Sequence, residues 1–68
     1  MSLHTIYDAS RILKMSDWHL RKLIKEGQIK TVLVERSMLE GKRHVPQLVV
    51  NAIERREIDR FIEEQRNA

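Results

Sequence analysis

The sequence contains no cysteine, one proline, two glycines and one each of tryptophan, tyrosine and phenylalanine. Without cysteine, the chain can form neither a disulfide framework nor a zinc site with thiolate ligands. No apolar run approaches the ~20 residues that a transmembrane helix requires. The N-terminal segment also lacks the basic region and apolar stretch of a secretory signal. We therefore expect a cytoplasmic protein that does not engage a membrane.

The chain is 68 residues long, with 41% apolar and 34% charged residues, which predicts a single domain over residues 1–68. A chain of this size buries only about 60% of its unfolded surface, so nearly all its apolar side chains are needed for the fold. There is no nucleophile–base pair, no glycine-rich phosphate loop, and no metal-ligand spacing among His4, His19 and His44. We expect a binding module, not an enzyme, with no cofactor and no metal.

The charge is unevenly distributed along the chain. Lysine and arginine number 13 against 10 aspartates and glutamates, a net charge of +3. Residues 1–43 contain nine basic and five acidic side chains, whereas residues 44–68 contain four basic and five acidic ones. A basic N-terminal part favours an anionic partner for that part, although a solvated surface with ordinary scatter of charge remains the alternative.

Two helices with a very short connection are predicted in the first part. Thr5 begins a capping-box sequence, and the helix that follows is predicted over residues 6–14. Ser16 is a favourable N-cap for a second helix over residues 17–26, which Gly27 would end in the left-handed conformation. Because so short a connection forces the helices to cross steeply, this pattern predicts a helix-turn-helix with the second as its recognition helix.

After Gly27 the sequence becomes typical of strands. Residues 29–35 and 47–53 are rich in β-branched and apolar side chains, and residues 36–46 between them contain Gly41 and the only proline. This predicts a β-hairpin wing over residues 29–53.

A last helix is predicted over residues 55–65, where Ile58, Phe61 and Ile62 share one face. A second capping-box sequence at residues 51–54 leaves open a start about three residues earlier. The predicted fold class is α+β and mostly helical: a winged helix-turn-helix with a β-hairpin wing and a C-terminal helix.

The sequence resembles a family of small winged helix-turn-helix domains found in phage and plasmid excisionases and in MerR-type regulators. The matching segments are Thr5-Ile6-Tyr7-Asp8-Ala9, Ile12-Leu13, Met15-Ser16, Leu23-Ile24-Lys25-Glu26-Gly27 and Arg56-Glu57-Ile58-Asp59-Arg60-Phe61-Ile62. Three features depart from the family pattern. Lys14 replaces the usual turn glycine, the wing segment is longer, and His19 and Arg21 occupy positions often held by threonine and tyrosine.

The resemblance implies a sequence-specific, architectural DNA-binding protein that binds double-stranded DNA cooperatively and directs an integrase or recombinase toward excision. Its partners would then be DNA, a recombinase and further copies of itself on the DNA, in the nucleoid of a bacterial or phage-infected cell. One alternative is a small phage or plasmid transcriptional regulator, or a replication or partition factor. A ligand-sensing MerR-type activator is disfavoured, because such proteins continue beyond the wing into a long dimerisation helix. An alternative of another class is a protein-interaction adaptor with a basic face.

The residues predicted to contact DNA lie on two elements. On the recognition helix they are Asp17, Trp18, His19, Arg21, Lys22 and Lys25, and on the wing they are Arg36, Lys42 and Arg43. The planar fork of Arg21 suits bidentate binding to a guanine, whereas Lys22 and Lys25 suit phosphates. A basic wing tip can reach a minor groove. For Trp18, contact with DNA and packing against the wing or last helix are both open.

Overall fold

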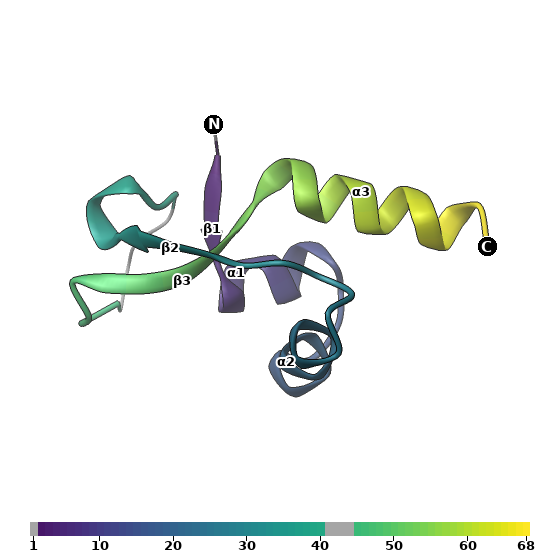
Figure 1. Cartoon of the computed structure of the whole chain (residues 1–68), viewed down its shortest axis with the longest axis horizontal. Helices are drawn as coiled ribbons and strands as arrows, with labels where there is room; N and C mark the ends of the chain where they lie inside the picture. Colours follow the sequence, from purple (N-terminus) through teal and green to yellow (C-terminus); the bar gives the residue numbers. More distant parts are fainter. Residues whose placement is uncertain (1, 41–44) are drawn as a thin grey trace.

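The computed structural model describes residues 2–40 and 45–68. In these residues an antiparallel sheet with strand order β1-β3-β2 combines with three α-helices, which makes the fold α+β. The chain order is β1 (Leu3–Thr5), α1 (Ile6–Ile12), α2 (Asp17–Lys25), β2 (Val32–Glu35), the 3-10 turn η1 (Arg36–Met38), β3 (Val49–Glu54) and α3 (Arg55–Arg66). Figure 1 shows α3 and the β2–β3 pair extending in opposite directions from the short strand β1.

Two predicted side-chain caps begin the first two helices. The Asp8 backbone N–H donates to Thr5 Oγ1 at 3.0 Å, and the His19 N–H donates to Ser16 Oγ at 3.0 Å. Each hydroxyl satisfies a backbone donor that has no partner within its helix. The caps therefore fix where α1 and α2 begin, and both predicted start positions are confirmed.

The first helix is shorter than predicted, ending at Ile12 instead of residue 14. Lys14 adopts φ 58°, and the Met15 N–H turns back to donate to the Ser10 carbonyl at 3.0 Å. A left-handed residue cannot continue a right-handed helix, so the chain turns here and only residues 13–16 connect α1 to α2. Lysine thus forms the turn in a backbone conformation that glycine adopts more readily.

The second helix ends at Lys25, one residue before the predicted limit, with Glu26 as its C-cap. Gly27 follows with φ 81°, the left-handed conformation expected of it, and the Gln28 N–H donates to the Leu23 carbonyl at 3.0 Å. This closing turn directs the chain away from α2 and into the segment that leads to β2.

The bounds of the two predicted strands differ from those in the structure, and the sheet contains a further strand, β1. The two predicted strands do pair antiparallel, with Val32 opposite Ala52 and Glu35 opposite Val49. The first strand is Val32–Glu35 instead of 29–35, and Ile29 packs into the core instead of extending it. The second is Val49–Glu54 instead of 47–53. Strand β1 was not predicted, yet it pairs with β3 along its whole length.

The last helix begins at Arg55, as predicted, and continues to Arg66, one residue beyond the predicted end. The alternative start at residues 51–54 is wrong, because those residues form most of β3. Strand β3 therefore runs directly into α3, with Glu54 as the N-cap residue. The loop predicted over residues 36–46 begins with η1.

The apolar side chains form two clusters on the sheet. The larger cluster joins all three α-helices to β3 through Ala9, Leu20, Leu23, Ile29, Ile53, Ile58 and Phe61. The smaller one consists of Leu3, Leu39 and Ala52. Neighbouring residues of β3 contribute to different clusters, Ala52 to the smaller and Ile53 to the larger, because successive strand side chains point to opposite faces. Both faces of the central strand are thus packed at this point.

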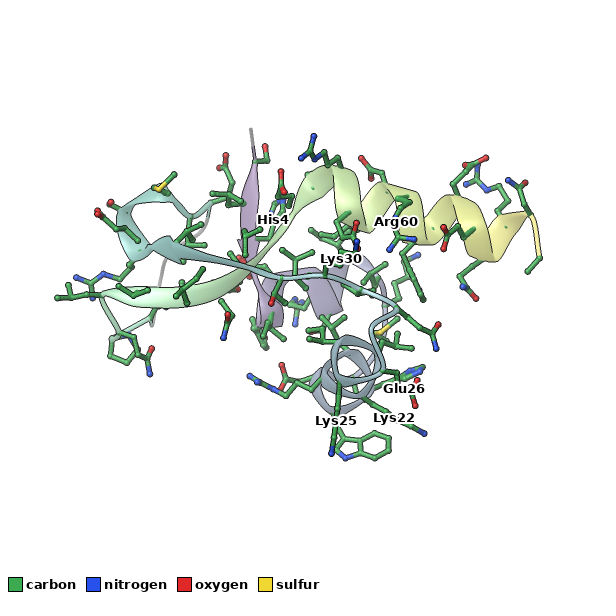
Figure 2. All side chains as sticks on the ribbon, in the orientation of Figure 1. His4, Lys22, Lys25, Glu26, Lys30 and Arg60 are labelled. Carbon is green, nitrogen blue, oxygen red and sulfur yellow. The ribbon has the colours of Figure 1, made fainter. Side chains whose placement is uncertain are left out.

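Charged side chains fasten α3 to the connection between α2 and β2. Glu57 Oε2 accepts a 2.8 Å hydrogen bond from the Lys30 backbone N–H, and Arg60 Nη2 donates to the same carboxylate oxygen and to the Gln28 carbonyl at 2.7 and 2.9 Å. The hydrogen bond from Arg60 is the main cause that lowers the pKa of Glu57 to about 2. Lys30 and Arg60 lie between that connection and α3 in Figure 2.

Within the part of the chain that the structure describes, no helix is long and apolar enough to cross a bilayer.

Candidate nucleic-acid interface

The side of α2 that faces away from the core carries the strongest cluster of predicted contact residues. Leu20 and Leu23 are buried on the inner side of the helix. Trp18, Arg21, Lys22 and Lys25 follow a three- and four-residue spacing on the opposite side, and all four are exposed. We call these four residues the α2 outer face. In Figure 2, Lys22 and Lys25 extend from α2 away from the sheet and from α3.

Trp18 is not packed against the hairpin or the last helix, so the packing alternative for this residue is wrong. Its side chain is 72% exposed, although an indole is among the largest apolar groups that a fold can bury. The Lys22 ammonium lies 5.7 Å from the centre of its ring, within the range of a cation–π contact. An apolar ring and a cation therefore stand side by side on the outer face, where they can contact an anionic partner together.

Arg21 is held by an acidic neighbour. Its Nε lies 2.7 Å from Asp17 Oδ2, one helical turn earlier, and both side chains remain substantially exposed. Asp17 is the first residue of α2, where a negative charge also suits the positive end of the helix dipole. In this pair the guanidinium is oriented toward the start of α2.

His19 does not share this face. It lines a shallow groove between α2 and α3 together with Leu13, Met15 and Phe61. The groove is lined mainly by apolar side chains of the turn and of α3, together with Gln28 and Gln65. The sequence places His19 next to Trp18, but successive residues of a helix point about 100° apart, so adjacency in sequence does not make them neighbours on the surface.

The predicted contact residues of the hairpin have different outcomes. Arg36 is half-buried at the start of η1, and its Nη1 donates to the carbonyls of Val45 and Pro46 at 2.9 and 3.3 Å. These bonds tie the two ends of the loop together, so its guanidinium serves the fold in this structure. Lys42 and Arg43 lie outside the described residues.

A second exposed aromatic–cation pair, which was not predicted as a site, lies on α1. Tyr7 is 59% exposed, and Arg11 Nη1 donates to its hydroxyl at 3.1 Å. The Arg11 guanidinium also lies 5.7 Å from the centre of the tyrosine ring. The spacing of four residues, the same as that of Trp18 and Lys22, was the sequence signal that could have identified this pair.

The hairpin presents exposed apolar side chains. Leu33, Leu48 and Val49 are 70%, 73% and 53% exposed. Leu33 lies directly opposite Asn51, and Val49 is two residues from Asn51 on the same strand. Because strand side chains alternate between the two faces, Leu33 and Val49 lie on the same side of the sheet. The described exposed side chains of this surface are mainly apolar, whereas the α2 outer face has three cations around Trp18.

No protein-family model matches the chain, and neither a curated protein nor a solved structure matches it significantly. Among the described residues, no group of three or more histidine, aspartate or glutamate side chains is arranged to hold a metal ion. The side chains of the α2 outer face offer exposed cations, one of them a guanidinium paired with Asp17, and an exposed indole.

Proposed function

We propose that this chain binds double-stranded DNA as a winged helix-turn-helix protein, with α2 as the recognition helix. The observation that carries the proposal is the α2 outer face, on which Arg21, Lys22 and Lys25 surround an exposed Trp18. The short connection between α1 and α2 supports the same reading, because in helix-turn-helix proteins the second helix enters the major groove while the first crosses the backbone.

Different side chains would perform different tasks in such a complex. Lys22 and Lys25 neutralise phosphates, which gives affinity without sequence preference. Arg21 reaches a base edge, where a guanidinium can bind the O6 and N7 atoms of guanine with two hydrogen bonds. Trp18 contacts a sugar or the methyl group of a thymine beside them. On α1, the exposed Arg11 is suited to a phosphate of the same duplex.

The β2–β3 hairpin takes the place of the wing. Arg36 supports this hairpin through its bonds to Val45 and Pro46. The wing contacts with DNA are assigned to Lys42 and Arg43, of which the arginine is the better suited to a narrow minor groove.

Within DNA binding, we favour an architectural role like that of the excisionases that the sequence resembles. The protein would bind adjacent sites, bend the duplex and bias an integrase toward excision. A small transcriptional regulator would use the same surface on a single operator. A duplex-bending assay with circularly permuted sites separates the two roles, because only the architectural role requires that the bound DNA bend.

Fluorescence anisotropy of a labelled mixed-sequence duplex, titrated with the protein at several salt concentrations, tests the proposal. Log affinity should fall linearly with log salt concentration, by about 0.9 for each phosphate neutralised. A cooperative titration would support assembly on adjacent sites. If no duplex binds even at low salt, the proposal fails and the adaptor that uses the basic face for an acidic protein replaces it.

A further inference from the structure

Asp17 is an acidic residue directly beside a basic surface; its charge suits the N-terminus of α2, but its ion pair with Arg21 adds little further stability. Asp17 Oδ2 and Arg21 Nε are 2.7 Å apart, but the two side chains are 46% and 62% exposed. Exposed pairs of this kind contribute little to stability, because water screens the charges. A carboxylate next to a phosphate-binding surface also repels the ligand. If α2 binds DNA, an effect of the pair on Arg21 would offset this repulsion.

We infer that Asp17 is a specificity-determining residue that positions Arg21 for bidentate binding to guanine; this inference rests on the proposed DNA-binding function. The carboxylate engages Nε of the guanidinium. The Nη1 and Nη2 groups form the opposite edge of the planar fork, and this edge is the one that matches the O6 and N7 acceptors of guanine in the major groove.

The gain from this arrangement is pre-organisation. A free arginine side chain has many rotamers, and binding a base in one geometry removes most of that freedom. Asp17 restricts Arg21 before the duplex arrives, so less side-chain entropy is lost on forming the two hydrogen bonds. A lysine at this position would not supply the same two-pronged geometry, because its ammonium is a point charge on a flexible stem.

Two other arginines show by contrast what is special about Arg21. The guanidinium of Arg36 bonds backbone carbonyls of its own loop. That of Arg60 bonds Glu57 and Glu64 and the Gln28 carbonyl. Both guanidinium groups use their Nη atoms in these bonds, and Arg60 also donates from Nε to Glu57, whereas among the described residues the bond of Arg21 is made through Nε.

A double-mutant cycle on sequence discrimination tests the inference. Duplexes are first selected from a random library with the complete chain, and the guanine that Arg21 contacts is located by changing each position of a selected duplex in turn. The measured quantity is the ratio of Kd values for the duplex without and with that guanine. This ratio is determined for the wild type, Asp17→Ala, Arg21→Ala and the double variant.

Arg21→Ala should reduce the ratio about fivefold or more, as expected for the loss of a bidentate base contact. Asp17→Ala should reduce it at least about twofold, with no further reduction when Arg21 is already alanine. Affinity for unrelated duplexes should rise in Asp17→Ala, because one negative charge has been removed. A purely electrostatic role would change Kd for both duplexes equally and leave the ratio unchanged.

Asp59→Ala provides the matched control. Asp59 accepts from Arg55 Nε at 3.2 Å in the same four-residue spacing, but on α3, so its loss should leave the ratio as it is. Circular dichroism melting verifies that all variants are folded. The inference is overturned if Asp17→Ala leaves the ratio unchanged, if the reduction is equal with and without Arg21, or if the wild type has no base preference. Absence of binding to every duplex would instead reject the proposed function itself.

Discussion

At the scale of single residues, Lys14 determines where the first helix stops. Its φ of 58° lies in the left-handed region, which a side chain with a Cβ atom occupies at a cost that glycine avoids. The cost is tolerated because the surrounding turn is fixed by hydrogen bonds, among them that of the Lys14 N–H to the Arg11 carbonyl at 3.1 Å. The turn therefore stores a small strain between α1 and α2.

Replacing Lys14 by glycine should relieve that strain. We expect Lys14→Gly to raise the free energy of unfolding by up to about 1 kcal/mol, since the backbone strain removed is partly offset by the greater freedom of glycine in the unfolded chain. Urea unfolding followed by circular dichroism measures the change. Lys14→Ala is the matched control, because it removes the same charge and keeps the strained backbone; equal stability of the two variants would contradict the explanation.

Lys25 should contribute to DNA affinity without contributing to specificity. Its ammonium lies on the α2 outer face and, in Figure 2, points away from the rest of the molecule. Lys25→Ala should weaken binding to every duplex by a similar factor and reduce the salt slope by about one unit. Anisotropy titrations on two unrelated duplexes measure both effects.

Lys30→Ala is the control for Lys25→Ala, since it removes the same charge from an exposed residue near α3. At moderate salt a cation farther than about 10 Å from the phosphates is largely screened, so this control should leave affinity nearly unchanged. Equal losses for both variants would mean that overall charge, and not the α2 outer face, determines binding.

The sequence was sufficient to place some residues of the candidate site but not others. Trp18, Arg21, Lys22 and Lys25 could be predicted as one face, because helical spacing alone puts them there once Leu20 and Leu23 are taken as core. The position of His19 could not, since it depends on where α3 packs. The role of Arg36 depends on carbonyls nine and ten residues away across a loop, for which the sequence contains no local signal.

At the scale of elements, local signals identified the helices, whereas the strands depended on distant partners. The caps of Thr5 and Ser16 act within three residues, so the sequence contains the full information for where α1 and α2 begin. Strand β1 has only three residues, too few for an alternating pattern, and exists because β3 lies beside it. This pairing joins segments that are nearly fifty positions apart, and no local sequence pattern indicates it.

The attachment of α3 to the α2–β2 connection should be sensitive to acid. The pKa of Glu57 is about 2 in the folded chain, against an ordinary value of 4.5, mainly because of the hydrogen bond from Arg60. A carboxyl group with a lowered pKa stabilises the folded state fully above its unfolded pKa, and this contribution is lost as the pH falls through the folded pKa. Stability should therefore decline between about pH 4.5 and about pH 2.

Glu57→Gln isolates this contribution. The variant should lose about 1–2 kcal/mol of unfolding free energy at neutral pH, and the acid-dependent decline should become shallower. Urea titrations at a series of pH values measure both quantities. Glu63→Gln is the matched control, because Glu63 is exposed and its ion pair with Arg66 is 4.0 Å long. A decline of the same steepness in Glu57→Gln and the wild type would contradict the assignment to Glu57.

At the scale of the whole molecule, the two ends of its 37 Å long axis differ in chemistry. Helix α3 extends toward one end and the β2–β3 pair toward the other, while α2 lies along one side (Figure 1). The exposed carboxylates Asp59, Glu63 and Glu64 on α3 are each paired with an arginine of the same helix, and the hairpin exposes Leu33 and Val49. A duplex that binds α2 would meet an excess of cations there, whereas on α3 positive and negative side chains balance and offer no net attraction.

This arrangement predicts how the molecule sits on DNA. In nitrogen–proton correlation spectra recorded during a titration with duplex, the backbone resonances of α2 and the indole N–H of Trp18 should shift, and those of Arg11 should follow. Resonances of the last turn of α3, at Glu63 and Glu64, should remain in place, because the carboxylates there are paired with arginines and leave no excess of positive charge to attract phosphates. The indole resonance is a direct reporter, since the chain has one tryptophan and its ring is exposed.

The same spectra separate the proposed function from its alternative. An acidic protein bound by an adaptor would also move the cations of α2, but its apolar groups would have a reason to seek Leu33, Leu48 and Val49 on the hairpin. A duplex offers no comparable apolar surface away from its grooves, so shifts with DNA should be centred on α2. If DNA leaves α2 unchanged and moves only α3 or the exposed apolar residues of the hairpin, the recognition helix has been assigned to the wrong element.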